Sequence, residues 1–128
     1  MKAPLTVEAF LLLAAFTTLA GCTGGKVTKS YDVAVDGNPN RGKQVIEQYG
    51  CGACHTIPGV PAARGVVGPP LTSLAQRTML AGELPNSPAN LVRWIENPSA
   101  IEPKTAMPTL GLTDSQARDV AAYLYTLR

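Results

Sequence analysis

Cys51-Gly52-Ala53-Cys54-His55 is the stretch that decides how the rest of the chain folds. It has the CxxCH pattern, in which two thiols one helical turn apart add to the vinyl groups of one porphyrin. The histidine after the second thiol then falls beneath the iron as an axial ligand. The sequence therefore predicts one covalent haem c, attached through Cys51 and Cys54, with His55 on the iron.

Two other chemistries use a CxxC pair. A thioredoxin-like dithiol needs a strand–helix–strand pattern around the pair, whereas glycine and proline fill the flanks here. A zinc site needs about four cysteine or histidine ligands, and the chain has 3 Cys and 1 His in all. Haem attachment is the interpretation that explains both the spacing and the residue order.

Length and composition predict a single domain with a thin core of its own. The chain has 128 residues, of which 45% are hydrophobic but only 5% aromatic. A porphyrin would supply the apolar surface that such a core lacks. The net charge of +2 is too small to indicate nucleic acid as a partner.

The N-terminal residues have the pattern of a bacterial export signal that ends in a lipidation site. Residues 1–21 contain a short apolar stretch, Phe10 to Ala20, which is too short to span a bilayer. Leu19-Ala20-Gly21-Cys22 resembles a lipobox, where cleavage before the cysteine precedes its acylation, so we expect a lipid anchor on Cys22. A buried thiol or a disulfide is the alternative for Cys22. Export would place the protein at the periplasmic face of a bacterial membrane, inner or outer.

Residues 22–37 are polar and lack periodicity, which predicts a flexible tether, and residues 38–128 form the globular domain. Proline and glycine in 56–70 predict a loop there, and 99–111 is expected to be a second loop. Capping and apolar spacing predict four helices: over 39–49, within 70–79, over 88–97, and from 113 towards the C-terminus.

Elimination points to the second axial ligand. The single histidine excludes a bis-histidine iron within this chain, and Met79 and Met107 are the methionines left after the signal. Met107 lies in a predicted loop and is followed by Pro108, which restricts the backbone, so we expect its sulfur on the iron. Met79, or an open or solvent-ligated iron, is the alternative. A His/Met iron is saturated, exchanges single electrons and has a raised reduction potential.

These motifs together resemble class I c-type cytochromes over residues 38–128. The segments Tyr49 to Val60 and Thr105 to Pro108 are similar to small cytochrome c domains that accompany haem-copper oxidases. The resemblance implies an all-α fold with three to five short helices around one covalent haem and long Gly/Pro-rich loops.

The same resemblance implies two further site residues. The carbonyl of Pro69 would orient the His55 imidazole, although Pro70 leaves the register open by one residue. Trp94 would lie near a haem propionate, or else be a core residue of its helix. Arg64 and Arg77 are candidates for propionate pairing or for the solvated surface.

The predicted function is that of a membrane-tethered electron carrier, not an enzyme. It would take single electrons from a reductase or dehydrogenase and pass them to a terminal oxidase. One alternative is a haem peroxidase or gas-binding sensor whose methionine is displaced by the ligand. Another is a cytochrome subunit of a periplasmic dehydrogenase.

Overall fold

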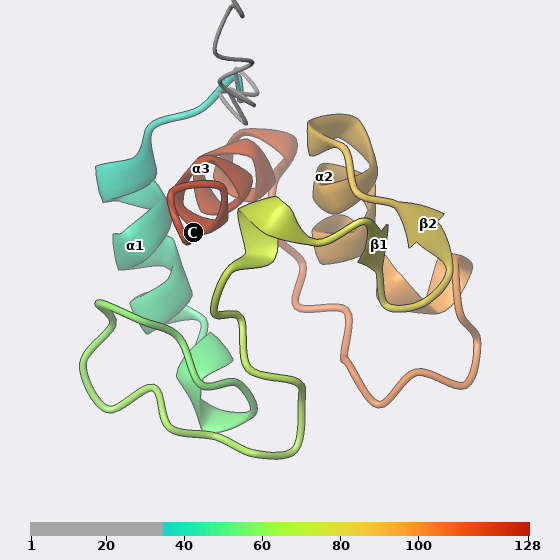
Figure 1. Cartoon of the computed structure of the whole chain (residues 1–128), viewed down its shortest axis with the longest axis horizontal. Helices are drawn as coiled ribbons and strands as arrows, with labels where there is room; N and C mark the ends of the chain where they lie inside the picture. The colour runs from blue at the N-terminus through green and yellow to red at the C-terminus, as the bar shows by residue number, and fades with distance from the viewer. Residues whose placement is uncertain (1–34) are drawn as a thin grey trace, which may run out of the picture.

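The computed structural model in Figure 1 describes residues 35–128 of the chain. The predicted signal, the lipidation site at Cys22 and the tether up to residue 34 lie outside these described residues. The regular elements are the helices α1 (Pro39–Gln48), α2 (Pro88–Glu96) and α3 (Asp114–Leu124), the 3-10 turns η1 (Cys51–Ala53), η2 (Leu74–Gln76) and η3 (Pro98–Ala100), and the short strands β1 (Met79–Leu80) and β2 (Leu84–Pro85).

The helix α1 begins and ends where its local sequence dictates. The side-chain oxygen of Asn38 accepts hydrogen bonds from the N–H groups of Asn40 and Arg41, which caps the first turn. After the C-cap residue Tyr49, Gly50 adopts a φ of +68°, a conformation that glycine takes at little cost. The chain therefore leaves the helix sharply and enters the CxxCH segment at once.

The predicted starts of α2 and α3 are also confirmed. The hydroxyl of Ser87 accepts a hydrogen bond from the N–H of Asn90, with Pro88 in the first turn. Thr113 and Gln116 form a reciprocal capping box at the start of α3. These caps satisfy N–H groups that a helix leaves without internal partners.

The helices α1 and α3 cross at close range. A Cβ added to Gly42 would lie 1.9 Å from the carbonyl oxygen of Asp119, so only glycine fits at the crossing. The buried carboxylate of Asp119 accepts hydrogen bonds from the Arg41 guanidinium at 2.7 and 2.9 Å and from the N–H of Asn38 at 2.6 Å. The hydrogen bond from Arg41 is the main cause that holds the pKa of Asp119 below its usual value.

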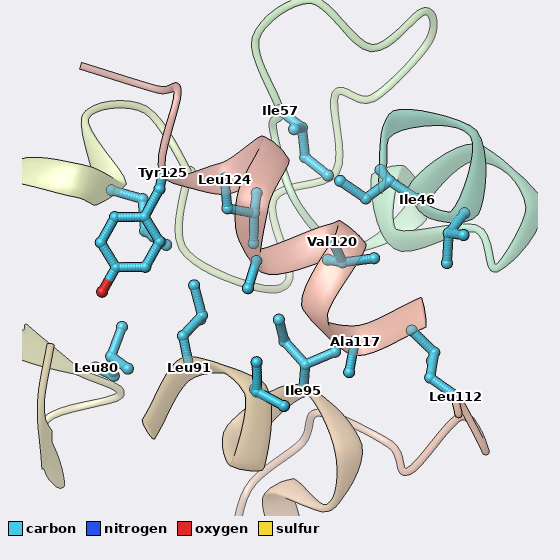
Figure 2. Packing of buried hydrophobic residues seen from close by; sticks show 14 of the residues in the cluster. Ile46, Ile57, Leu80, Leu91, Ile95, Leu112, Ala117, Val120, Leu124 and Tyr125 are labelled. Atoms are coloured by element: carbon cyan, nitrogen blue, oxygen red, sulfur yellow. The ribbon is translucent and has the colours of Figure 1, made fainter. Parts of the chain in front are cut away.

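The hydrophobic core lies on the side of α3 that faces α1 and α2 (Figure 2). Its large buried side chains come from all three helices and from the loops between them. They include Ile46, Ile57, Leu80, Leu91, Ile95, Leu112, Val120, Leu124 and Tyr125. The core therefore ties every long loop to the C-terminal helix.

The short helix predicted within residues 70–79 is confirmed only in part. Only the 3-10 turn η2 forms there, and Ser73 before it has a φ of +53°, which an α-helix cannot include. The chain then pairs Met79 with Pro85 and Leu80 with Leu84 in an antiparallel ribbon. Met79 therefore lies in a strand rather than at a helix end.

The all-α prediction is confirmed, because within residues 35–128 the sheet consists of this two-stranded ribbon alone. The segment 56–70 is a loop, as expected, with one isolated bridge between Thr56 and Arg64. Val35 is half-buried against the core, and a Cβ on Gly37 would meet the Arg118 carbonyl oxygen at 2.4 Å. Val35 and Gly37, at the end of the predicted tether, thus already contact the domain. None of the helices described is long and apolar enough to cross a membrane.

Candidate functional site

A cavity of about 610 Å³ lies between the two long loops and the helices. In Figure 1 both loops, the green one over 56–70 and the orange one over 101–112, extend from the same end of the helical layer. Every residue predicted to bind the haem borders this one cavity: Cys51, Cys54, His55, Pro69, Trp94 and Met107.

The turn η1 brings the CxxCH side chains to one wall. The N–H groups of Cys54 and His55 both donate to the carbonyl oxygen of Cys51, at 3.2 and 3.0 Å. Both thiols are free and half-buried in this structure. Burial raises the pKa of the Cys51 thiol, because apolar surroundings favour the neutral form.

The imidazole of His55 is oriented by the loop that follows it. Its Nδ1 lies 2.7 Å from the carbonyl oxygen of Pro69. A carbonyl only accepts, so the proton of this bond is on Nδ1, and Nε2 keeps its lone pair for a metal. The carbonyl of Pro70 accepts instead from the guanidinium of Arg77, so in this structure the proline facing His55 is Pro69.

Gly68 lets the backbone lie flat against the imidazole. A Cβ at this position would lie 2.3 Å from Cε1 and 2.6 Å from Nδ1 of His55. Real Cβ atoms do not approach a ring so closely, and the loop or the ring would have to move. Gly68 is therefore a positioning residue for His55, a role that the match of Gly68-Pro69 to the Gly-Pro pair of class I cytochromes did not by itself reveal.

The loop on the histidine side is held by hydrogen bonds along its length. Two run back to the CxxCH segment, two involve Thr56, and one comes from α3. They join Gly65 N to Gly52 O (3.0 Å), Gly68 N to Cys54 O (2.8 Å), Leu71 N to Thr56 O (2.8 Å), Thr56 Oγ1 to Gly65 O (3.1 Å) and Tyr123 Oη to Pro58 O (2.6 Å). These hydrogen bonds hold this wall of the cavity in place.

Met107 reaches the cavity from the other loop. It is half-buried, and its N–H donates to the hydroxyl of Thr105 at 3.2 Å. Met79 borders the cavity too, but it lies on β1 and is 43% exposed. The structure thus brings both methionines to the same space, and the choice of Met107 as ligand stays a prediction.

The remaining predicted residues have different surroundings. Trp94 is half-buried on α2 and borders the cavity. Arg77 borders it as well, while its guanidinium also donates to the carbonyl oxygen of Thr72 at 3.1 Å. Arg64 is exposed and does not border the cavity. Arg77 is therefore the better placed of the two arginines to meet a charged group there.

Asn86 supports the site in a way that sequence reasoning missed. Its Nδ2 donates to the carbonyl oxygens of Leu74 and Arg77, at 2.8 and 2.9 Å, and its Oδ1 accepts from the hydroxyl of Tyr125 at 2.7 Å. Asn86 thus joins the wall near Arg77 to the end of α3. No local pattern marks this role, since Tyr125 lies 39 positions away in the chain.

The cavity fits the group that the sequence predicts. Most of its walls are apolar, and apart from His55 the charged side chains among its described lining are Arg77 and Glu102. Two thiols, an imidazole with a free Nε2 and a thioether border the same space. Cysteine sulfur for covalent attachment, with histidine and methionine for iron, is the donor set of a cytochrome c haem.

Comparisons with known proteins agree with this chemistry. The family model described as Cytochrome c matches residues 39–128. The chain is 32% identical over 90 residues to cytochrome c oxidase subunit 2 of Alkalihalophilus pseudofirmus, which covers 70% of this chain but 25% of that protein. It is 34% identical over 114 residues to cytochrome c2 of Rhodomicrobium vannielii, which covers 80% of this chain and 90% of that protein. The chain thus spans about a quarter of the oxidase subunit and most of the cytochrome c2.

Proposed function

The chain belongs to the cytochrome c family and is an electron-transfer protein with one covalent haem c, and from this premise we propose that it delivers single electrons to a terminal oxidase while anchored to a membrane. The observation that carries the proposal is that Cys51, Cys54, His55 and Met107 line one cavity. Within it, Cys51 and Cys54 would hold the haem, and His55 and Met107 would supply the nitrogen and sulfur ligands of its iron. A bound haem supplies an iron that gains and loses one electron.

The residues around the site favour electron transfer over bond-making chemistry. With both His55 and Met107 as ligands, the iron of a bound haem would have no vacant position for a substrate. The hydrogen bond from His55 to the Pro69 carbonyl keeps the imidazole in one tautomer and orientation. A rigid, saturated site changes its geometry little when the charge on the iron changes, which favours fast single-electron exchange.

The oxidase is proposed as the acceptor because one relative is named as a subunit of cytochrome c oxidase. The other relative is named as a cytochrome c2, which supports a carrier of similar size. The anchor on Cys22 is proposed from the lipobox alone. A lipid chain on this residue would keep the haem domain near membrane-bound partners.

Two measurements test the proposal. The mature protein, purified from a host that exports and matures c-type cytochromes, should carry the mass of one haem and of an acylated Cys22. When reduced with ascorbate and added to membranes of the source organism, it should be oxidised and should drive cyanide-sensitive oxygen uptake. A colourless protein would refute the haem site. A haem protein that those membranes do not oxidise would refute the oxidase as acceptor, and oxidation or reduction by a periplasmic dehydrogenase would then be tested.

One observation favours a second function, a haem that binds gases or peroxide after Met107 leaves the iron. Among the described residues, the hydrogen bonds of the segment 106–112 are limited to Met107 N with Thr105 Oγ1 and Thr109 Oγ1 with Asn97 Oδ1. Binding of carbon monoxide to the reduced protein at neutral pH separates the two functions. Slow or absent binding is expected for the carrier, and fast binding would favour the sensor or peroxidase.

A further inference from the structure

Asn86 closes the turn that carries Arg77. Its Nδ2 donates to the carbonyl oxygens of Leu74 and Arg77, at 2.8 and 2.9 Å, and its backbone N–H donates to the carbonyl oxygen of Thr78 at 2.9 Å. One residue thus satisfies three carbonyl groups of the segment 74–78. Without the Asn86 side chain, two of these groups would need water or a new partner, and the segment would change its conformation.

Tyr125, the C-cap residue of α3, holds Asn86 in place. Its hydroxyl donates to Asn86 Oδ1 at 2.7 Å, which turns the amide so that its N–H groups face the carbonyl oxygens. Tyr125 is buried, and burial raises the pKa of its hydroxyl, so this group stays a hydrogen-bond donor. Two residues further on, the Leu127 carbonyl oxygen accepts from the N–H of Ala75 at 3.1 Å. The η2 turn is therefore fastened to the segment after α3 by two separate contacts.

Arg77 extends this support to the loop that faces His55. Its Nη2 donates to the carbonyl oxygens of Pro70 and Thr72. Pro70 directly follows Pro69, whose carbonyl oxygen lies 2.7 Å from His55 Nδ1. Two backbone rotations separate the two proline carbonyl groups, and the ring of Pro70 fixes one of them. A shift of the Pro70 carbonyl would therefore move the Pro69 carbonyl as well.

We propose that Asn86 and Tyr125 are positioning residues for His55, acting through Arg77 on the Pro69 carbonyl. The inference rests on the proposed function, in which His55 binds the iron. Neither Asn86 nor Tyr125 borders the haem cavity, so an effect of either on the haem site would be transmitted by the residues between. A hydrogen bond donated by Nδ1 makes an imidazole a stronger ligand. A looser bond would therefore favour the reduced iron over the oxidised iron.

The test compares the holoprotein with its Tyr125→Phe variant, which loses one hydroxyl and no charge. Deuterium exchange of the His55 Nδ1 proton, followed by NMR in the reduced protein, should be about 5-fold to 10-fold faster in the variant. The hyperfine-shifted ring signals of His55 in the oxidised protein should move. The ratio of reduced to oxidised protein at a fixed potential should rise by at least about 2-fold. Asn86→Ala should act in the same direction, and Tyr125→Phe decides the question by itself if Asn86→Ala does not fold.

Two further variants serve as controls. Asp119→Asn tests for a general loss of stability, because the partners of Asp119 lie at the start of α1. It should lower the melting temperature and leave the His55 ring signals in place. Arg77→Gln tests the route of transmission. Adding Tyr125→Phe to Arg77→Gln should change the exchange rate by less than about 2-fold, because the two residues act in one network.

Different results would overturn the inference at different steps. Unchanged exchange and ring signals in Tyr125→Phe, or ring signals that move as far in Asp119→Asn, would show that Tyr125 does not position His55. An equal effect of Tyr125→Phe with and without Arg77→Gln would show that its hydroxyl acts by another route. In both cases the proposed function would stand. A wild-type holoprotein without hyperfine-shifted His55 signals would instead refute His55 as an iron ligand, and both proposals would fail.

Discussion

The loops on the two sides of the cavity are built in different ways. In the loop after His55, backbone N–H groups donate to the CxxCH turn, the Pro58 carbonyl oxygen accepts from the Tyr123 hydroxyl of α3, and Thr56 Oγ1 donates to the Gly65 carbonyl oxygen. The loop with Met107 is held mainly near its ends, where Asn97 Oδ1 accepts from Ala100 N at 3.3 Å and Thr113 caps α3. Its middle, among the described residues, has two side-chain hydrogen bonds.

Under the proposed function, this difference means that the two loops contribute differently to holding the iron. The loop over 56–70, here called the histidine wall, is held by hydrogen bonds along its length, so substitutions there should affect both the stability of the fold and the orientation of His55. The loop over 101–112, here called the methionine wall, has few internal hydrogen bonds. Substitutions there should therefore alter the ligation of the iron and leave the stability of the fold nearly unchanged. Three predictions test this contrast and one tests the contact between α1 and α3 behind both loops, from the largest expected effect to the smallest.

Met107→Ala should remove the sulfur-to-iron charge-transfer band of the oxidised protein completely. The reduction potential should also fall, by on the order of 0.1–0.2 V, because axial ligands set haem potentials over a range of about 0.8 V. Helical circular dichroism should be retained. Met79→Ala is the matched control and should keep the band. Loss of the band in Met79→Ala and its survival in Met107→Ala would exchange the roles of the two methionines.

Gly68→Ala should destabilise the histidine wall by about 1–3 kcal/mol, because its Cβ has no room beside the imidazole. Thermal melting of the holoprotein measures this effect, and the hyperfine-shifted NMR signals of His55 should move. Gly111→Ala is the control in the other loop. Gly111 has a φ of +72° and open space around its added Cβ, so alanine there adds only backbone strain, about 1–2 kcal/mol. Unchanged His55 signals in Gly68→Ala would show that the glycine does not position the ring.

The buried Asp119 should make folding sensitive to acid. Its pKa is lowered in the folded state, chiefly by Arg41, so its contribution to stability is present above the unfolded pKa of about 3.9 and is lost as the pH falls through the folded pKa. Asp119→Asn should lower the melting temperature at neutral pH by roughly 5 °C. The gap between variant and wild type should close in acid.

Asp114→Asn is the control for that measurement. Asp114 also pairs with an arginine, Arg118, but both side chains of this pair are exposed. Exposed pairs contribute little, so this variant should melt close to wild type. Equal effects of the two substitutions would mean that burial of Asp119 is not what matters.

A pair of threonine substitutions compares the loops most directly. Thr56→Val removes a hydrogen bond to the Gly65 carbonyl on the histidine side and should cost about 1 kcal/mol in unfolding. Thr105→Val removes the acceptor of the Met107 N–H and should shift the melting temperature by less than about 2 °C. It should instead let the sulfur–iron band disappear at a lower temperature. The opposite ranking of the two melting temperatures would contradict the contrast between the loops.

Much of the helical fold was predictable because its signals are local. The Ser87 cap, the Thr113–Gln116 box and Gly50 act on the residues next to them, and the three α-helices begin or end within a few residues of their predicted limits. The CxxCH segment likewise carries its own chemistry. It predicted the cofactor, which the family comparison supports.

The errors and omissions concern contacts between distant residues. The strands β1 and β2 have two residues each, too few for an alternating pattern to be seen, so the ribbon was not predicted and Met79 was placed at the end of a helix. In the sequence, Asp119 looks like any polar residue of an amphipathic helix. Its role becomes visible only in the structure, where Arg41, 78 positions earlier in the chain, lies beside it. The need for glycine at position 68 likewise becomes visible only when the loop is folded against the His55 imidazole. Pairings of this kind follow from tertiary packing and leave no local trace.

The hydrogen bond from the Asn38 N–H to the Asp119 carboxylate also has a mechanical consequence. The described chain enters the domain at the end of Figure 1 opposite the two ligand-bearing loops, and the first helix is fastened there to the last one. A pulling force on the N-terminal side would be taken up by the contact between α1 and α3. The distance between His55 and Met107 would then not change when the N-terminal segment is pulled. The domain would be tethered on the side where α1 begins, and the side with the two loops would stay accessible to a partner.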